Sequence, residues 1–314
     1  MKYSNLEIIG HQKQFEILKN CYKRNFPQSW LFFGDKGIGK SLFVHKFISW
    51  SIAFDLFKKD ISDKDLTNDE INTLNSYFYS TVYEINNEEK ISDLESIRKL
   101  INKIVLTNFS EKLNKYIILD NVESLNINSK NALLKTIEEP PEKTIILLIC
   151  HNIYNLPRTI ISRCLNLEFN NLIKKDFYKY LDFFSLDFDE NEKQKIFNFS
   201  NGSPGLFHKI QNNNGMQLVE KFNDIIKEET LNHLILKEIS EKLIKESEMV
   251  FILLKRFFFL KCVELAKNTK DNNFLYKIIA FLEIIKDNNE TNLNIDKNQI
   301  ITNIFVNYYE LIKK

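Results

Sequence analysis

Short apolar runs and helical patterns alternate over the first 170 residues of the chain. The apolar runs cover residues 30–33, 116–119, 145–150 and 165–169. The segments with helical spacing cover residues 11–24, 40–54, 91–106 and 129–139. Runs that are apolar on both faces are typical of a parallel sheet that is covered by helices. We therefore predict an α/β fold for this part, and we interpret residues 55–90, which are polar and have no clear period, as an insertion or loops.

The remainder of the chain lacks the turn residues that strands need. After Gly205 there is one more glycine, Gly215, and no proline. Apolar residues recur there at helical spacing, for example at Leu231, Leu234, Ile235, Ile239 and Leu243. A compact set of short helices between residues 171 and 209 precedes this region. We predict three domains: an α/β domain over 1–170, a small helical domain over 171–210 and an all-helical domain over 211–314.

The charge balance and the apolar runs exclude several classes of protein. The 314 residues include 43 Lys and Arg against 42 Asp and Glu, a balance that argues against holding nucleic acid through a dominating field of the chain's own. The longest apolar runs, such as 145–150 and 257–260, are too short to cross a bilayer, and the first ten residues lack the apolar core of a signal peptide. Four scattered cysteines without a CxxC pair indicate reduced thiols rather than a disulfide or zinc framework. We expect a cytoplasmic protein.

A phosphate-binding loop stands between the first predicted strand and the helix that follows it. The segment Gly34-Asp35-Lys36-Gly37-Ile38-Gly39-Lys40-Ser41 fits the P-loop pattern G-x-x-x-x-G-K-[ST] at every fixed position. Glycines Gly34, Gly37 and Gly39 let successive backbone N–H groups point at phosphate oxygens, and the helix adds its positive N-terminal dipole. Lys40 is expected to reach the β- and γ-phosphates of ATP, and the Ser41 hydroxyl to ligate magnesium.

A second predicted strand ends in a carboxylate. Asp120 follows the apolar run Tyr116–Leu119, at the edge of the sheet where ligands of open α/β folds bind. We expect it to act on magnesium as a Walker B aspartate does, with a strand-end cap as the alternative. Hydrolytic P-loop proteins of this class usually carry Glu directly afterwards, whereas this chain has Asn121, which cannot act as a general base near neutral pH. Glu123 stands two residues further on and is expected to point elsewhere, so we expect no efficient hydrolysis of ATP.

Three further motifs complete a resemblance to a known family. Residues 129–141 read SKNALLKTIEEPP, residues 162–164 read Ser-Arg-Cys, and residues 202–205 read Gly-Ser-Pro-Gly. With the P-loop and the Asp120 strand, these motifs occur in the order found in the clamp-loader family of AAA+ proteins. Within that family the chain resembles the delta-prime branch of bacterial DNA polymerase III. The resemblance covers residues 5–210 well. The remainder resembles the family's collar domain only in its fold class, because both are all-helical. It implies that residues 171–210 are a helical lid.

The resemblance implies a role for Arg163 in trans. In this family the Ser-Arg-Cys arginine projects into the ATP site of a neighbouring subunit and stabilises charge on the γ-phosphate. The chain has five arginines among its 43 basic residues, so an arginine here indicates a need for the planar guanidinium that lysine lacks. The alternative is an ordinary salt bridge. For Arg158, support of the same interface and solvation of a turn stay equally open.

Two departures from the family pattern, Asn121 and Gly205, bear on the chain's own ATP site. Related ATPase subunits carry a nucleotide-sensing arginine where this chain has Gly205. The family's other sensor falls near His151 or Asn152, and either could donate a hydrogen bond. Many members also hold zinc through four cysteines after the P-loop helix, but residues 54–95 contain no cysteine, so we expect no zinc. Asn121 and Gly205 together indicate a subunit that completes another subunit's catalytic site and has no independent catalytic activity.

The resemblance also implies partners. They are an ATPase subunit and a delta-like subunit in one assembly, and through that assembly the sliding clamp and primed DNA. One alternative is the ATP-hydrolysing, gamma/tau-like subunit of the same clamp loader. Another is an unrelated P-loop kinase for a small molecule, which would need a basic lid that a chain with five arginines does not offer.

Overall fold

The structure is a computed structural model, and the chain forms two compact units in it. It describes residues 8–58, 66–85, 95, 99, 102, 104, 113–184, 186, 188–227, 249–287 and 297–313. The first unit comprises residues 1–187 with Gly202–Gly205, and the second comprises residues 188–201 with 206–314. The predicted domain boundaries after residues 170 and 210 stay predictions.

The first unit is built on a five-stranded parallel sheet. Its strands, in spatial order, are β2 (Val82–Ile85), β3 (Lys115–Leu119), β4 (Thr144–Cys150), β1 (Ser29–Phe33) and β5 (Leu165–Glu168). Every pair of neighbours is parallel, so all the strands end at one edge of the sheet, which we call the carboxyl edge. We call the opposite edge the amino edge. The predicted α/β fold with a parallel sheet is confirmed.

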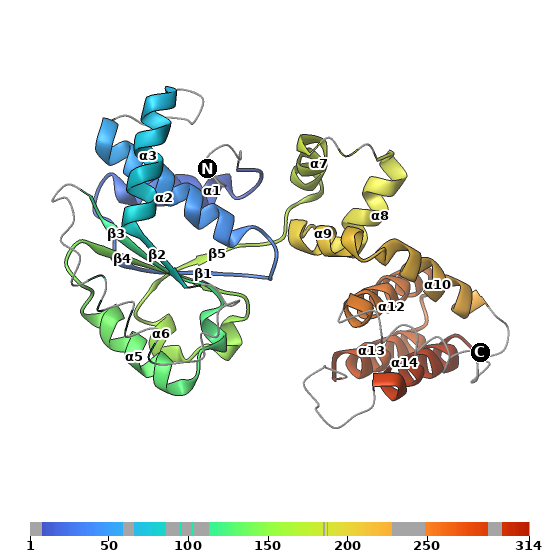
Figure 1. Cartoon of the computed structure of the whole chain (residues 1–314). Coiled ribbons are helices and arrows are strands. Elements are labelled where there is room, and N and C mark those ends of the chain that lie inside the picture. Colours follow the sequence, from blue (N-terminus) through green and yellow to red (C-terminus); the bar gives the residue numbers. More distant parts are fainter. Residues whose placement is uncertain are drawn as a thin grey trace. The chain divides into compact units, whose positions relative to one another are not determined.

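Helices cover both faces of this sheet, as Figure 1 shows. One face carries α1 (Gln12–Tyr22), α2 (Lys40–Phe57) and α3 (Asn68–Thr81), and the other carries α5 (Ile127–Glu138) and α6 (Arg158–Ile161). Successive strand side chains enter the two cores in turn: Trp30 and Phe32 pack with α1 and α2, whereas Leu31 packs with α5 and α6. This alternation is the period of a β-strand, and it explains why β1, β3 and β4 contain continuous apolar runs. The first unit ends with α7 (Lys174–Phe183).

The interpretation of residues 55–90 as an insertion or loops is wrong, because this segment contains α3 and β2. Helix α3 begins with a capping box in which Thr67 and Glu70 exchange side-chain and backbone hydrogen bonds. Its described side chains are mostly exposed or half-buried, and β2 is an edge strand with no fully buried residue, so neither has a strong apolar period. The predicted helix over 91–106 lies mostly outside the described residues.

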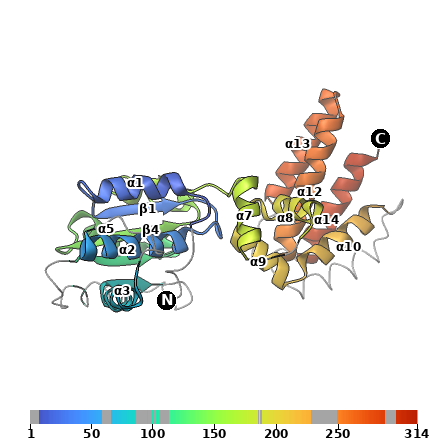
Figure 2. The same cartoon turned by 90° about the horizontal axis from the view of Figure 1, so that it is seen from above.

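The second unit is helical in its described residues. Its helices are α8 (Glu190–Ser200), α9 (Pro204–Asn212, which starts in the first unit), α10 (Gly215–Lys227), α12 (Met249–Asn268), α13 (Asn272–Asp287) and α14 (Lys297–Ile312). Helices α13 and α14 run side by side (Figure 1, Figure 2). The core of the second unit is rich in aromatic side chains. Phe222, Phe258 and Phe305 are buried there, and the ring of Phe305 contacts the rings of the other two. The helical segment predicted from Leu231 to Leu243 lies outside the described residues. No helix among the described residues has the length and apolar character that a membrane crossing requires.

Candidate functional site

The P-loop lies at the carboxyl edge, between the end of β1 and the start of α2. Gly34, Gly37 and Gly39 all have positive φ values, of 148°, 84° and 96°. At Gly34 the backbone also passes so close to β5 that a Cβ atom would stand 2.0 Å from the Phe169 carbonyl oxygen. The loop therefore needs glycine for its conformation and, at Gly34, for the close approach of a second strand.

Lys40 folds back onto this loop. Its Nζ donates hydrogen bonds to the carbonyl oxygens of Gly34 at 2.6 Å and Asp35 at 2.7 Å. The side chain is 3% exposed, and this burial lowers the pKa of Lys40 to about 8 although the carboxylates of Asp120 and Glu123 act in the opposite direction. Lys40 is thus a desolvated ammonium group held by backbone carbonyls beside two carboxylates. An anionic ligand in the loop would compete with those carbonyls for it.

Asp120 and His151 meet at the ends of the neighbouring strands β3 and β4. Asp120 Oδ1 lies 3.4 Å from His151 Nε2. This oxygen is buried and makes no hydrogen bond within the described part of the chain. Burial raises the pKa of Asp120 and lowers the pKa of His151, so both groups resist charge in this position. A buried carboxylate oxygen without a hydrogen bond is suited to receive a cation or a polar ligand.

Glu123 caps the end of β4. Its Oε1 accepts hydrogen bonds from the backbone N–H groups of His151 at 2.7 Å and Asn152 at 3.0 Å. It therefore lies at the carboxyl edge, close enough to Lys40 to affect its pKa, but its carboxylate is engaged by the two backbone groups. Asn121 has a left-handed conformation with φ of 56° and starts the short 3-10 helix Val122–Ser124. The two positions differ in function: Asn121 makes a turn, and Glu123 fixes a strand end.

A buried histidine contacts the first turn of the P-loop helix α2. His45 is 2% exposed; its Nδ1 lies 2.7 Å from the Ser41 carbonyl oxygen and its Nε2 lies 2.9 Å from Glu84 Oε2. Both partners are acceptors, so both ring nitrogens are best satisfied as donors in an imidazolium ion. Burial alone would lower the pKa of His45, but the hydrogen bond and charge of Glu84 outweigh it and the pKa is raised. The pair ties the first turn of α2 to the edge strand β2.

The turn Gly202–Gly205 lies directly on the P-loop. The Gly205 N–H donates to the Gly37 carbonyl oxygen at 2.7 Å, and the Ser203 hydroxyl donates to the Lys36 carbonyl oxygen at 3.3 Å. A Cβ atom on Gly205 would stand 2.7 Å from the Gly37 Cα, a distance that real side chains do not adopt. The turn thus has no space for a side chain at Gly205, the position where the sequence leads us to expect the arginine of related ATPase subunits.

Arg163 lies far from the chain's own P-loop. Strand β5 begins beside Trp30 and ends beside Phe33, so Arg163, two residues before β5, belongs to the amino edge, whereas Gly34 follows Phe33 at the carboxyl edge. Four strand residues separate the two edges by roughly 13 Å. The Arg163 side chain is 40% exposed, and it donates hydrogen bonds to Glu138 and to the Thr159 carbonyl oxygen. Arg158 begins α6 and is exposed.

A family model decides the relationship of this chain to known proteins. The model described as "DNA polymerase III, delta subunit" matches residues 10–173, which is more than half of the chain. The chain belongs to this family. The resemblance to clamp-loader subunits of DNA polymerase III is thereby confirmed. The matched residues contain the P-loop, Asp120 and Arg163.

Curated relatives carry two kinds of subunit name. DNA polymerase III subunit gamma of Buchnera aphidicola subsp. Acyrthosiphon pisum is 28% identical over 236 residues, which are 70% of this chain and 62% of the relative. DNA polymerase III subunit delta' of Buchnera aphidicola subsp. Schizaphis graminum is 34% identical over 116 residues, which are 37% of this chain and 33% of the relative. The chain thus spans less than two thirds of the length of each. A solved DNA polymerase III gamma subunit-related protein from Thermotoga maritima is similar at 19% identity, with a TM-score of 0.44 over 95% of this chain and 99% of that one.

The structure adds residues that the sequence reasoning missed. His45 and Glu84 come together from α2 and β2, and the sequence carried no signal for the pair because β2 was not predicted. His151 was considered only as a hydrogen-bond donor, and its contact with Asp120 follows from the adjacency of β3 and β4. Within the described ranges no three side chains of His, Cys, Asp or Glu are grouped in a way that could hold a metal ion.

Proposed function

We propose that this chain is a delta-prime-like subunit of the DNA polymerase III clamp loader that supplies Arg163 to the ATP site of a neighbouring subunit. The observation that carries the proposal is the placement of Arg163 at the amino edge, exposed and opposite the chain's own P-loop. From there the guanidinium cannot reach a phosphate held by Gly34–Ser41. A role on ATP therefore requires the site of another subunit, in which the planar fork would stabilise charge on the γ-phosphate.

The residues of the chain's own P-loop fit a nucleotide, and the proposal assigns them to binding rather than hydrolysis. Gly34, Gly37, Gly39 and Lys40 would hold the phosphates of ATP, and Ser41 with Asp120 would hold magnesium. The buried Asp120 oxygen without a hydrogen bond supports this assignment, as does the desolvated ammonium of Lys40. When bound, magnesium would neutralise phosphate charge.

Three residues argue against turnover at this site. Asn121 cannot accept a proton from water near neutral pH. The Glu123 carboxylate accepts two backbone hydrogen bonds, so using it as a base would disrupt the end of β4. Gly205 adds no cation to the site.

The second candidate is the ATP-hydrolysing, gamma/tau-like subunit. It is favoured by the names of several relatives, among them subunit gamma of Buchnera aphidicola and subunit tau of Bacillus subtilis. In either case the proposed partners are other clamp-loader subunits, including an ATPase and a delta-like subunit, with the sliding clamp and primed DNA reached through the assembly. The proposed location is the cytoplasm.

Reconstitution with an ATPase subunit, a delta-like subunit and a clamp separates the two candidates. In the delta-prime-like role, Arg163→Ala lowers clamp-dependent ATP hydrolysis by the partner by about 10³-fold or more, and Arg163→Lys restores little. Lys40→Ala leaves the partner's rate near that of the unchanged chain. Glu138→Gln is the matched control, because it removes the carboxylate that pairs with Arg163 and keeps the guanidinium. Equal losses from Arg163→Ala and Lys40→Ala favour the hydrolytic subunit.

A separate titration of the isolated chain tests its own P-loop. Magnesium–ATP is expected to bind saturably, and Lys40→Ala is expected to abolish that binding. Brisk turnover of ATP by the isolated chain would contradict the delta-prime-like role. Absence of saturable binding would reduce the loop to a structural element and leave the role of Arg163 intact.

A further inference from the structure

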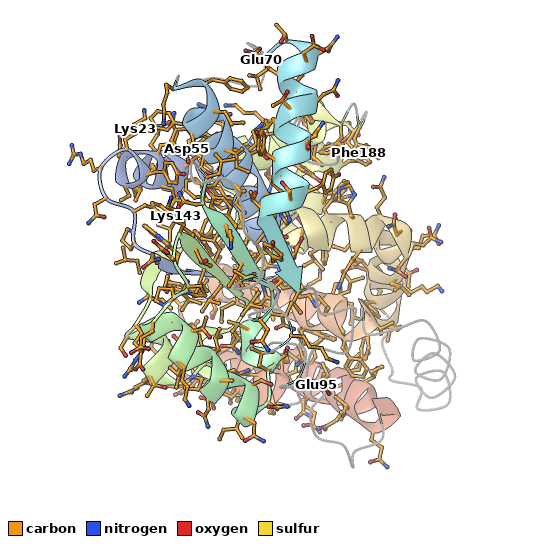
Figure 3. All side chains as sticks on the ribbon, turned by 60° about the vertical axis from the view of Figure 1, so that its left-hand side comes forward. Lys23, Asp55, Glu70, Glu95, Lys143 and Phe188 are labelled. Carbon is orange, nitrogen blue, oxygen red and sulfur yellow. The ribbon has the colours of Figure 1, made fainter. Side chains whose placement is uncertain are left out.

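A polar cavity lies at the amino edge of the sheet, away from the P-loop. It has a volume of about 290 Å³ and is lined by residues from the end of α1, the end of α2 and the starts of β3 and β4, among them Arg24, Phe26, Asp55, Asn114 and Thr144. Figure 3 labels Asp55, one of the lining residues, and Lys23, the neighbour of Arg24 in the sequence. All the lining residues belong to the first unit.

Opposite charges line this cavity without pairing. Within the described part of the chain, the Arg24 guanidinium makes no ion pair or hydrogen bond. Neighbouring Lys23 is placed over the rings of Trp50 and Phe54, at 5.9 and 5.8 Å from their centroids. Arg24 is the cationic residue among those that line the cavity, and arginine is rare in a chain whose default cation is lysine.

One of the two carboxylate oxygens of Asp55 accepts a hydrogen bond. Its Oδ2 accepts a hydrogen bond of 2.6 Å from the Tyr22 hydroxyl, which in turn accepts one of 3.0 Å from the Asn114 side-chain amide. Asp55 Oδ1 makes no hydrogen bond within the described residues. Tyr22 and Asn114 therefore hold the carboxylate in one orientation and leave an acceptor oxygen for a ligand. Burial raises the pKa of Asp55, although the hydrogen bond from Tyr22 and the charge of Lys58 act in the opposite direction, and a cationic group in contact with the carboxylate would favour its ionised form further.

We propose that this cavity binds a small molecule that carries an anionic group, a carboxylate or a phosphate, at one end and an ammonium group at the other. The anionic group pairs with the Arg24 guanidinium in the bidentate manner that arginine allows. The ammonium group donates to Asp55 Oδ1. The body of the molecule packs on Phe26 and Ile145, the apolar residues of the lining. Because the volume lies at the lower end of the range for ligand cavities, the site suits an amino acid or an aminoalkyl phosphate rather than a nucleotide.

Calorimetric titration of the full chain tests this site. The probes are the individual L-amino acids and phosphoethanolamine, with acetate, inorganic phosphate and ethylamine as probes that carry one of the two groups. At least one two-charge probe is expected to bind saturably, and at least about tenfold more tightly than the one-charge probes. The amino acids and phosphoethanolamine distinguish a carboxylate site from a phosphate site.

Variants locate the binding. Arg24→Gln, a change at an exposed residue, is expected to weaken the best probe at least about tenfold, and Asp55→Asn by a similar factor. Lys23→Gln, the adjacent exposed control, and Lys40→Ala in the P-loop are expected to leave its affinity within about twofold. The proposal is overturned if no two-charge probe saturates the chain at about 10 mM, if Arg24→Gln leaves binding unchanged, or if acetate or phosphate binds as tightly as the two-charge probes. If Asp55→Asn fails to fold, the affinity of Arg24→Gln for the best probe alone decides whether the proposal stands.

Discussion

Gly205 and Gly37 are in direct backbone contact. The N–H of Gly205 donates to the carbonyl oxygen of Gly37 at 2.7 Å, and the space for a Cβ on Gly205 is filled by the Gly37 Cα. The glycine at position 205, where the resemblance leads us to expect the sensing arginine of related ATPase subunits, therefore has a structural consequence: it lets the 202–205 turn pack on the phosphate loop. An arginine there would push the turn away from the loop.

The first prediction concerns this contact. Gly205→Ala places a methyl group 2.7 Å from the Gly37 Cα, and it should lower the free energy of unfolding of the first unit by about 1–3 kcal/mol. Urea unfolding followed by tryptophan fluorescence measures this, because Trp30 and Trp50 are the two tryptophans of the chain and both lie in the first unit. Lys209→Ala, at an exposed position of the same helix, should change it by less than about 0.5 kcal/mol. Equal stability of the two variants would show that the turn does not pack on the loop in solution.

The second prediction concerns the ion pair of Arg163 and Glu138. Both side chains are about half exposed, at 40% and 48%, so water screens their attraction. Arg163→Ala and Glu138→Gln should each change the free energy of unfolding by less than about 1 kcal/mol. Thermal and urea unfolding of the isolated chain measure this. A larger loss in Arg163→Ala would give the arginine a structural role and weaken any interpretation of its effect in the assembly.

The strands at the centre of the sheet could be predicted from sequence because each buries both faces. The apolar run Ile145–Cys150 is typical of a strand buried on both faces, and it lies in β4. The P-loop could be predicted because its glycines are required by backbone geometry. Strand β2 and helix α3 could not, because their side chains are only partly buried and give no strong period. His45 pairs with Glu84, and Glu123 accepts hydrogen bonds from the end of β4, only because particular strands are neighbours in the sheet. A single sequence does not give the order of the strands.

The third prediction follows from the buried ammonium of Lys40. Burial lowers its pKa from the ordinary 10.5 to about 8, so between these values the unfolded chain binds more protons than the folded chain. The free energy of unfolding should therefore rise with pH over this interval relative to Lys40→Met, by at most about 3 kcal/mol. Urea unfolding of both proteins at pH values from about 7 to about 10 measures the difference. Lys209→Met serves as the exposed control, and parallel curves for all three proteins would show that Lys40 is solvated.

The fourth prediction concerns His45, whose pKa is raised. Burial opposes the charge, but Glu84 and the Ser41 carbonyl favour the imidazolium, and Asp120 adds to them. A base with a raised pKa in the folded state stabilises the fold fully below its unfolded pKa of about 6.5, and this contribution is lost as the pH rises through the folded value. Glu84→Gln removes the carboxylate, so this variant should lose less stability than the unchanged chain as the pH rises above about 6.5.

NMR titration of the His45 ring tests the same assignment directly. In the unchanged chain its signals should titrate above the ordinary pKa of histidine, and Glu84→Gln should shift that titration to lower pH. His11 provides an internal control, because burial lowers its pKa and its signals should titrate on the other side of the ordinary value in both proteins. If the His45 signals instead titrate below the ordinary pKa of histidine, as those of His11 are expected to do, the fold does not favour the charged form of the His45 ring. The first turn of α2, which carries Lys40 and Ser41, would then be held to β2 by a neutral hydrogen bond, whose contribution to stability is smaller.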